Sequence, residues 1–179
     1  MDAGLAVLLA AVDQAFRRKS WHGPNLRGAL RGVTAEQASW RPAPGRHNIW
    51  ELTLHAAYWK YVVTRRLRGT ARRSFPLPGR DFFARPFSEA PAEPGRSAAR
   101  AAADPIVCET DWRRELELLT EMHRELHAAI AALPAAAVER PIGGTKTTAR
   151  DLILGAAAHD LYHAGQIQLL KRLQAGRTA

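Results

Sequence analysis

Apolar residues recur at helical spacing in four stretches of the chain, residues 2–19, 48–67, 110–133 and 148–173. This spacing places the apolar residues of each stretch on one face of an α-helix, and in 110–133 they alternate at steps of three and four positions. Each apolar face needs a partner to cover it, and helices meet this need by packing against one another. The pattern therefore predicts an all-α fold, and we expect a four-helix bundle.

Two of the predicted helices begin at recognisable capping residues. Asn48 is followed three positions later by Glu51, and Thr148 is followed three positions later by Asp151. This is the spacing of a capping box, in which two side chains satisfy the free N–H groups of the first helical turn. The spacing predicts that the second and fourth long helices start at these residues.

The segment 69–108 interrupts the helical pattern. The residues that break it are Pro76, Pro78, Gly79, Pro86, Pro91, Pro94, Gly95 and Pro105. Because proline removes a backbone donor and clashes with the preceding turn, a long helix is excluded here. We predict a long crossover between the second and third long helices, with an aromatic patch at Phe82, Phe83 and Phe87. A lid or an oligomer contact is the alternative, since loops of this length are often functional.

A chain of 179 residues can bury a substantial core, and we expect one domain over residues 1–179. The single cysteine, Cys108, excludes an internal disulfide and a cysteine-based zinc site, and it is compatible with a reducing cytoplasm. The apolar start of the chain has no basic leader of the kind that signal peptides carry. No uncharged apolar run approaches the roughly 20 residues that span a bilayer. We therefore expect a cytoplasmic protein with no membrane partner.

The formal net charge is +9, which favours anionic partners such as a nucleic acid, a membrane surface or an anionic substrate. The basic residues are nevertheless scattered along the whole chain, and most are arginines mixed with glutamates. No nucleic-acid recognition motif accompanies them. We therefore expect no specific nucleic-acid partner.

The candidate chemistry lies in the fourth predicted helix. His159 and His163 are four residues apart, so their side chains share one helix face at roughly 5–6 Å between Cβ atoms, a spacing at which two imidazoles can hold one metal ion. Apolar residues on either side, among them Leu152 and Ile167, indicate that this face points into the protein. A buried imidazole is costly unless its nitrogens have partners. The pair is therefore predicted either to bind a metal ion or to hydrogen bond to core neighbours.

Other histidines extend this candidate site or compete with it. His55 also lies on an apolar stripe, and three neutral imidazoles with open positions describe a catalytic type of metal site. Sequence gives no distance between helices, so the part played by His55 stays open. His123 and His127 repeat the four-residue spacing within a highly charged run, where we expect a solvated helix flank. Gln166 follows one turn after the second histidine of the pair, where it would orient a ligand or satisfy another polar group.

Two sequence motifs around these histidines are similar to those of a known family. They read Asn-Ile-Trp-Glu-Leu-Thr-Leu-His-Ala-Ala-Tyr-Trp at 48–59 and Ala-His-Asp-Leu-Tyr-His-Ala-Gly-Gln-Ile at 158–167. Together they resemble the DinB/YfiT-like superfamily. The resemblance implies an up-down-down-up four-helix bundle with a long crossover between the second and third helices. It also implies a divalent metal ion, either zinc, nickel or iron, held by His55, His159 and His163.

The resemblance further implies thiol chemistry. Characterised members of the superfamily include thiol S-transferases that use bacillithiol, mycothiol or glutathione. A metal held by three imidazoles keeps open positions and its full charge, and it would activate a bound thiol or water. We expect a metal-dependent thiol S-transferase or a related hydrolase. The alternative is a non-catalytic, stress-related bundle protein that binds a metal.

Two carboxylates are candidates for proton transfer at this site. Glu51 lies one turn before His55, and Asp160 directly follows His159. Either could relay a proton or orient a ligand histidine. The thiol is expected to be a small-molecule cofactor, because the chain offers no suitable cysteine. The expected partners are thus a small-molecule thiol and an electrophile, and a homodimer is left open.

Overall fold

The computed structural model describes residues 2–70, 75–85 and 108–176. The long helices of this part are α1 (Ala3–Phe16), α4 (Ile49–Arg68), α5 (Glu109–Ala131) and α6 (Ala149–Ala175). The short ones are α2 (Leu26–Ala29), α3 (Ala35–Ser39) and the 3₁₀ helix η2 (Ala135–Ala137). Each long helix lies within a few residues of one predicted stretch. The described ranges contain no β-strand, so the predicted all-α class is confirmed.

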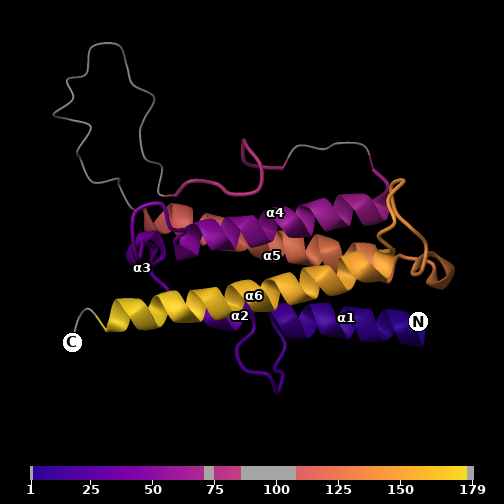
Figure 1. Cartoon of the computed structure of the whole chain (residues 1–179), viewed down its shortest axis with the longest axis horizontal. Coiled ribbons are helices and arrows are strands. Elements are labelled where there is room, and N and C mark those ends of the chain that lie inside the picture. Colours follow the sequence, from indigo (N-terminus) through magenta and orange to yellow (C-terminus); the bar gives the residue numbers. More distant parts are fainter. Residues whose placement is uncertain (1, 71–74, 86–107, 177–179) are drawn as a thin grey trace, which may run out of the picture.

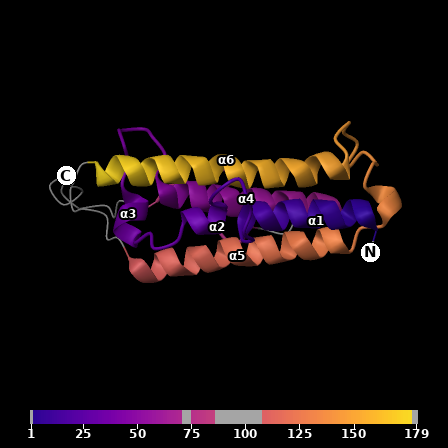
Figure 2. The ribbon, with the colours of Figure 1, turned by 90° about the horizontal axis from the view of Figure 1, so that it is seen from below.

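The long helices lie side by side along the long axis of the molecule (Figures 1 and 2). α1 and α6 run in one direction, and α4 and α5 run in the opposite direction (Figure 1). α4 packs on α5, α1 packs on α6, and α4 also contacts α6. This arrangement brings the second and fourth predicted helices together, and these are the helices that carry the candidate metal ligands.

The two predicted caps are both present, but they differ in detail. Thr148 Oγ1 accepts a hydrogen bond from the N–H of Asp151 (3.1 Å), and the Asp151 carboxylate accepts one from the N–H of Thr148 (3.0 Å). Asn48 Oδ1 likewise accepts from the N–H of Glu51 (2.8 Å). The Glu51 carboxylate instead accepts from the guanidinium of Arg41 (2.8 Å). The capping box predicted at Asn48 is therefore only half formed, because a charged partner engages the glutamate.

The apolar core consists of two clusters at successive levels along the bundle. One cluster lies where the short helices pack on the long ones, and it includes Trp50 of α4 and Ile167 of α6. The other lies toward the opposite end and includes Val63 of α4 and Ile153 of α6. The candidate histidines of α6 fall between the two clusters, at the middle of the bundle.

Within the predicted crossover, the described residues 75–85 pack on the bundle. The rings of Phe75 and Phe83 are buried, and their centroids lie 5.5 and 5.8 Å from that of Tyr58 on α4. This loop therefore covers α4 (Figure 1). Phe87, the third member of the predicted aromatic patch, lies outside the described residues.

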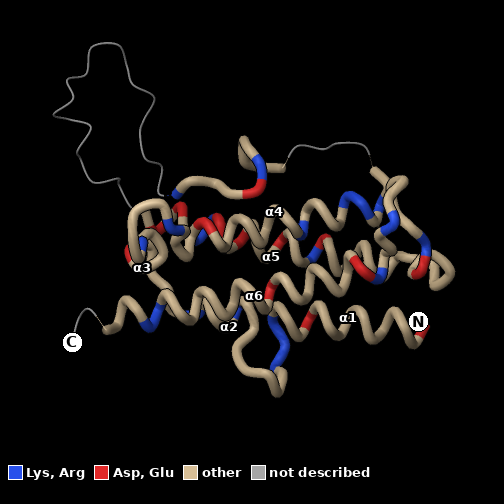
Figure 3. Tube along the Cα trace, in the orientation of Figure 1, with Lys and Arg blue, Asp and Glu red and all other residues tan. Residues whose placement is uncertain are grey.

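Charged residues are distributed over several elements of the fold. Lys and Arg occur on helices and loops, interspersed with Asp and Glu (Figure 3). The picture matches the scattered basic residues of the sequence. Within the described ranges, no helix is both long and apolar enough to cross a membrane.

Candidate metal centre

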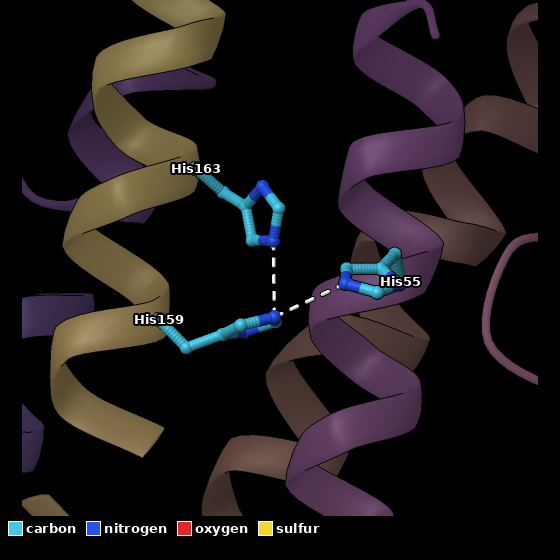
Figure 4. A group of neighbouring side chains, drawn as sticks. All are labelled: His55, His159 and His163. Carbon is cyan, nitrogen blue, oxygen red and sulfur yellow. Dashed lines mark hydrogen bonds between the residues drawn. The ribbon is translucent and has the colours of Figure 1, made fainter. Parts of the chain in front are cut away.

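Three histidines from two helices meet in the middle of the bundle (Figure 4). His55 lies in the second turn of α4, and His159 and His163 lie one turn apart on α6. Nε2 of His159 is 3.1 Å from Nε2 of His55 and 3.0 Å from Nε2 of His163. Each residue offers a ligand atom within 4.8 Å of the other two, and no other group of this kind occurs in the described part of the chain. We call these residues the histidine triad.

Two rings of the histidine triad are held through their Nδ1 atoms. Nδ1 of His55 lies 3.1 Å from the carbonyl oxygen of Asp81 and 3.2 Å from its Oδ1. Nδ1 of His163 lies 2.6 Å from Oε1 of Gln166. Because these oxygens can only accept, we assign the ring proton of both histidines to Nδ1. Each Nε2 then carries a lone pair directed at the other rings.

This convergence of lone pairs fits a cation. A neutral His159 has a single N–H and can donate it to one of the two facing nitrogens at most. Of the contacts that Nε2 of His159 makes with Nε2 of His55 and Nε2 of His163, at least one would then bring two nitrogen lone pairs together, which is repulsive. A metal ion at the common focus would accept all three lone pairs, and three imidazole nitrogens are a known donor set for metal sites with open positions.

The three imidazoles are held in the neutral form that metal binding requires. Burial lowers the pKa of His159 to about 3 and the pKa of His163 to about 4. Burial also lowers the pKa of His55, although its contacts with Asp81 act in the opposite direction. At neutral pH the Nε2 lone pairs are therefore available to a metal ion.

The loop that covers α4 supplies contacts for which the sequence carried no signal. Asp81 has a φ of 68° and is the one non-glycine residue with a positive φ in the described ranges. Its Oδ1 accepts a hydrogen bond from Nε1 of Trp59 (2.9 Å). Phe82 stacks on the ring of His55 at 4.0 Å and on the ring of His47 at 3.8 Å between centroids. No periodic pattern connects a proline-rich loop with a helix, so these contacts emerge only in three dimensions.

Glu51 and Asp160, the predicted candidates for proton transfer, are both buried and bonded to basic residues. Glu51 Oε2 accepts from Arg41 (2.8 Å) and lies 2.9 Å from Nδ1 of His47. Burial acts to raise the pKa of Glu51, but the hydrogen bonds from Arg41 and His47 outweigh it, so the pKa lies below its usual value. Asp160 accepts from the ammonium group of Lys60 on α4. The structure thus gives both carboxylates partners outside the histidine triad.

The second histidine pair, on α5, forms a separate cluster. Nε2 of His123 lies 3.1 Å from Oδ1 of Asp13, and its ring stacks on Phe16 at 4.0 Å. His123 is buried, so the solvated flank predicted for it was wrong; its charged sequence neighbours project from other sides of α5. Burial lowers the pKa of His123 to about 3. His127 is half-buried, and its Nε2 lies 3.8 Å from Oδ2 of Asp13.

Two grooves lie elsewhere on the molecule. One of about 1250 Å³ runs between α5 and the region of α1 and α2, where Arg27 and Trp112 are among its lining residues. The other, of about 720 Å³, lies where Trp40 approaches the C-terminal end of α6. Neither groove is lined by a member of the histidine triad. Among the described residues, neither groove contains a group of three side chains that could bind a metal ion. The histidine triad therefore remains the candidate functional site.

A family model described as the DinB superfamily matches residues 20–167. The matched range includes all three histidines of the triad. No curated protein and no solved structure matches the chain.

Proposed function

This chain belongs to the DinB superfamily, and from that membership and its histidine triad we propose that it is a metal-dependent enzyme. The proposed reaction transfers a low-molecular-weight thiol to an electrophile or, with water in place of the thiol, hydrolyses a related substrate. We also propose that the long helices form the up-down-down-up bundle implied by the family resemblance. The observation that carries the proposal is the meeting of three neutral imidazole nitrogens from α4 and α6.

The proposed ion is divalent, either zinc, nickel or iron, and imidazole ligands alone do not choose among these metals. His55, His159 and His163 would hold it through their Nε2 atoms. All three ligands are neutral, so they would leave the charge of the ion uncompensated. Because the triad supplies only three donors, it would also leave coordination positions for a thiol or water. An ion of this kind lowers the pKa of a bound thiol or water, so the nucleophile forms near neutral pH.

Residues outside the histidine triad orient its rings. Asp81 accepts from Nδ1 of His55, and Gln166 accepts from Nδ1 of His163, which keeps each Nε2 directed at the common focus. Outer contacts of this kind typically change metal affinity by about 10–100-fold. The proton-transfer role predicted for Glu51 would act through His47, whose Nδ1 it holds at 2.9 Å. We therefore propose that Asp81 and Gln166 orient the ligand histidines, and that Glu51 serves proton transfer through His47.

The thiol is proposed to be a small molecule such as bacillithiol, mycothiol or glutathione. Cys108 is the single cysteine of the chain, and it lies at the N-terminal cap of α5 rather than on α4 or α6. None of the triad contacts described above involves it. The sulfur nucleophile of a transferase would therefore have to come from outside the chain.

A non-catalytic metal-binding protein is the second candidate. It is favoured by one observation, that neither described groove is lined by a residue of the histidine triad. In that case the ion would hold α4 against α6 and would activate no substrate. A turnover assay separates the two candidates.

The test uses the full chain loaded anaerobically with Zn²⁺, Ni²⁺ or Fe²⁺. The protein is incubated with an alkyl halide and each thiol in turn, and loss of free thiol is measured against metal-free protein. We expect metal-dependent consumption of at least one thiol. His163→Ala should lose both the metal and the turnover, whereas His127→Ala, a histidine of α5 outside the triad, should keep both.

The outcomes separate the parts of the proposal. Full metal content in His163→Ala would contradict the metal site itself. Metal binding without turnover of any thiol, and without hydrolysis when thiol is absent, would instead support the non-catalytic candidate.

A further inference from the structure

A layer of buried polar residues lies at the boundary between the two apolar clusters of the core. On α6, the last buried residue of the cluster around Ile153 is Ala157, and the first buried residue of the cluster around Ile167 is Ala164. The members of the layer are Asp13 of α1, Lys60 of α4, His123 of α5 and Asp160 of α6. Each is at most 7% exposed. Each long helix therefore contributes one member of this layer.

These side chains are connected through a single aromatic ring. The ammonium group of Lys60 forms an ion pair with Oδ2 of Asp160. The same ammonium lies 4.8 Å from the centroid of the Phe16 ring, which attracts a cation to its face. His123 stacks on that ring at 4.0 Å and lies 3.1 Å from Oδ1 of Asp13. Contacts thus run continuously from α6 through α4 and α1 to α5.

The layer lies at the level of the histidine triad. Asp160 directly follows His159 on α6. Lys60 directly follows Trp59, whose ring approaches that of His159 edge-on at 6.3 Å between centroids. The ion pair between Lys60 and Asp160 therefore joins the same two helices whose relative position determines whether the histidines meet.

Stability alone does not account for this ion pair. Burying two charges removes their hydration, and replacing such a pair with apolar residues of similar volume is often neutral or stabilising. Oδ1 of Asp160 is also buried and has no hydrogen-bond partner among the residues that the structure describes, which is a further cost. A buried charged pair can instead contribute positional specificity, because it is satisfied over a narrower range of helix rotations and axial registers than an apolar contact.

The register matters because metal coordination tolerates little displacement. Ligand distances in metal sites stay within about 0.2 Å of their preferred values, whereas a slip of one residue along a helix is about 1.5 Å. Purely apolar cores keep their stability more readily than their unique packing. Buried polar residues, by contrast, are known to specify the register of packed helices.

We propose that the ion pair between Lys60 and Asp160 is a positioning element that fixes α4 against α6 and thereby sets the geometry of the histidine triad. Phe16 and His123 extend this element to the other two long helices. The inference rests on the proposed function in that it takes the triad to be a metal site. It assigns Asp160 a role through Lys60 rather than through a direct contact with a ligand histidine.

The test compares stability with metal affinity in the full chain. Zn²⁺ affinity is measured by competition with a chromophoric chelator, Co²⁺ absorption reports the ligand geometry, and urea unfolding gives the stability of the metal-free protein. The variants are Lys60→Met, the apolar pair Lys60→Met/Asp160→Leu and the neutral hydrogen-bonding pair Lys60→Gln/Asp160→Asn. Leu8→Ala shortens a buried side chain in the apolar cluster that includes Val63 and Ile153, and it controls for destabilisation alone.

We expect the apolar pair to recover stability lost in Lys60→Met, yet to bind Zn²⁺ about tenfold more weakly than the wild type and to show an altered Co²⁺ spectrum. The neutral pair should bind Zn²⁺ more tightly than the apolar pair. Leu8→Ala should lose stability and keep its affinity. If the apolar pair does not fold, Lys60→Met and Leu8→Ala are compared under conditions where both are folded, and the same difference in affinity is expected.

Wild-type affinity and an unchanged Co²⁺ spectrum in the apolar pair would overturn the inference, as would equal affinity losses in Lys60→Met and Leu8→Ala. A wild-type protein that binds no Zn²⁺, Ni²⁺ or Fe²⁺ would overturn the proposed function first, and the positioning role with it. The metal titration of the wild type therefore separates failure of the proposed function from failure of the positioning role, because only the former leaves the wild type without a bound metal.

Discussion

Replacing Gln166 by leucine removes the acceptor that holds the ring of His163 and keeps a side chain of similar size on α6. In the wild type, Oε1 of Gln166 lies 2.6 Å from Nδ1 of His163. His163 is only 3% exposed, so water does not readily replace the lost acceptor. The ring then has two responses, to leave the N–H unsatisfied or to move its proton to Nε2. The second response removes the lone pair that a metal needs.

The size of the effect follows from this choice. An unsatisfied buried N–H costs about 1–3 kcal/mol, and loss of an outer contact to a ligand histidine typically weakens metal binding by about 10–100-fold. That range corresponds to about 1.4–2.7 kcal/mol of binding free energy. We therefore expect Gln166→Leu to bind Zn²⁺ at least about tenfold more weakly than the wild type while remaining folded.

The assay is a Zn²⁺ titration in competition with a chelator of known affinity. Gln168→Leu is the matched control, because Gln168 lies two positions further along the same helix, is also half-buried and takes no part in the triad contacts described above. An affinity of Gln166→Leu within about twofold of the control would refute the reasoning. It would mean that the ring orientation of His163 does not depend on its acceptor.

Three further outcomes are expected. Histidines of the unfolded chain titrate near pH 6.5, whereas the pKa values in the folded state are about 3 for His159 and about 4 for His163. The contribution of these two histidines to the free energy of unfolding is therefore fully present above about pH 6.5 and is lost as the pH falls toward the folded values, by at most about 1.4 kcal/mol per histidine and pH unit. Urea unfolding of the metal-free protein should thus show a drop in stability between pH 7 and 5, and a flat profile would contradict the buried neutral rings. Saturating Zn²⁺ should raise the apparent free energy of unfolding by about 4 kcal/mol at 1,000 times Kd; His55→Ala should lose this gain in thermal melts, and an equal gain in that variant would exclude His55 as a ligand. Because Asp81 has a φ of 68°, Asp81→Gly should be about 1 kcal/mol more stable than Asp81→Ala in urea unfolding, and equal stabilities would argue against strain in this loop.

Local patterns in the sequence determined the helices and one half of the site. The spacing of apolar residues predicted all four long helices, because burial of one helix face repeats every three to four positions. The same periodicity placed His159 and His163 on one face of α6 without reference to any other element. The capping residue Thr148 marked the start of that helix for an equally local reason.

The tertiary structure decided the contacts between elements. The family resemblance pointed to His55, but its Nε2 comes within 3.1 Å of His159 only because α4 packs against α6. The placement of Asp81 beside His55 depends on how a loop folds back onto α4, and no helical or strand period describes such a loop. Helical periodicity reports which face of each helix is buried; it carries no information on the axial register between two helices, which packing and buried polar pairs set.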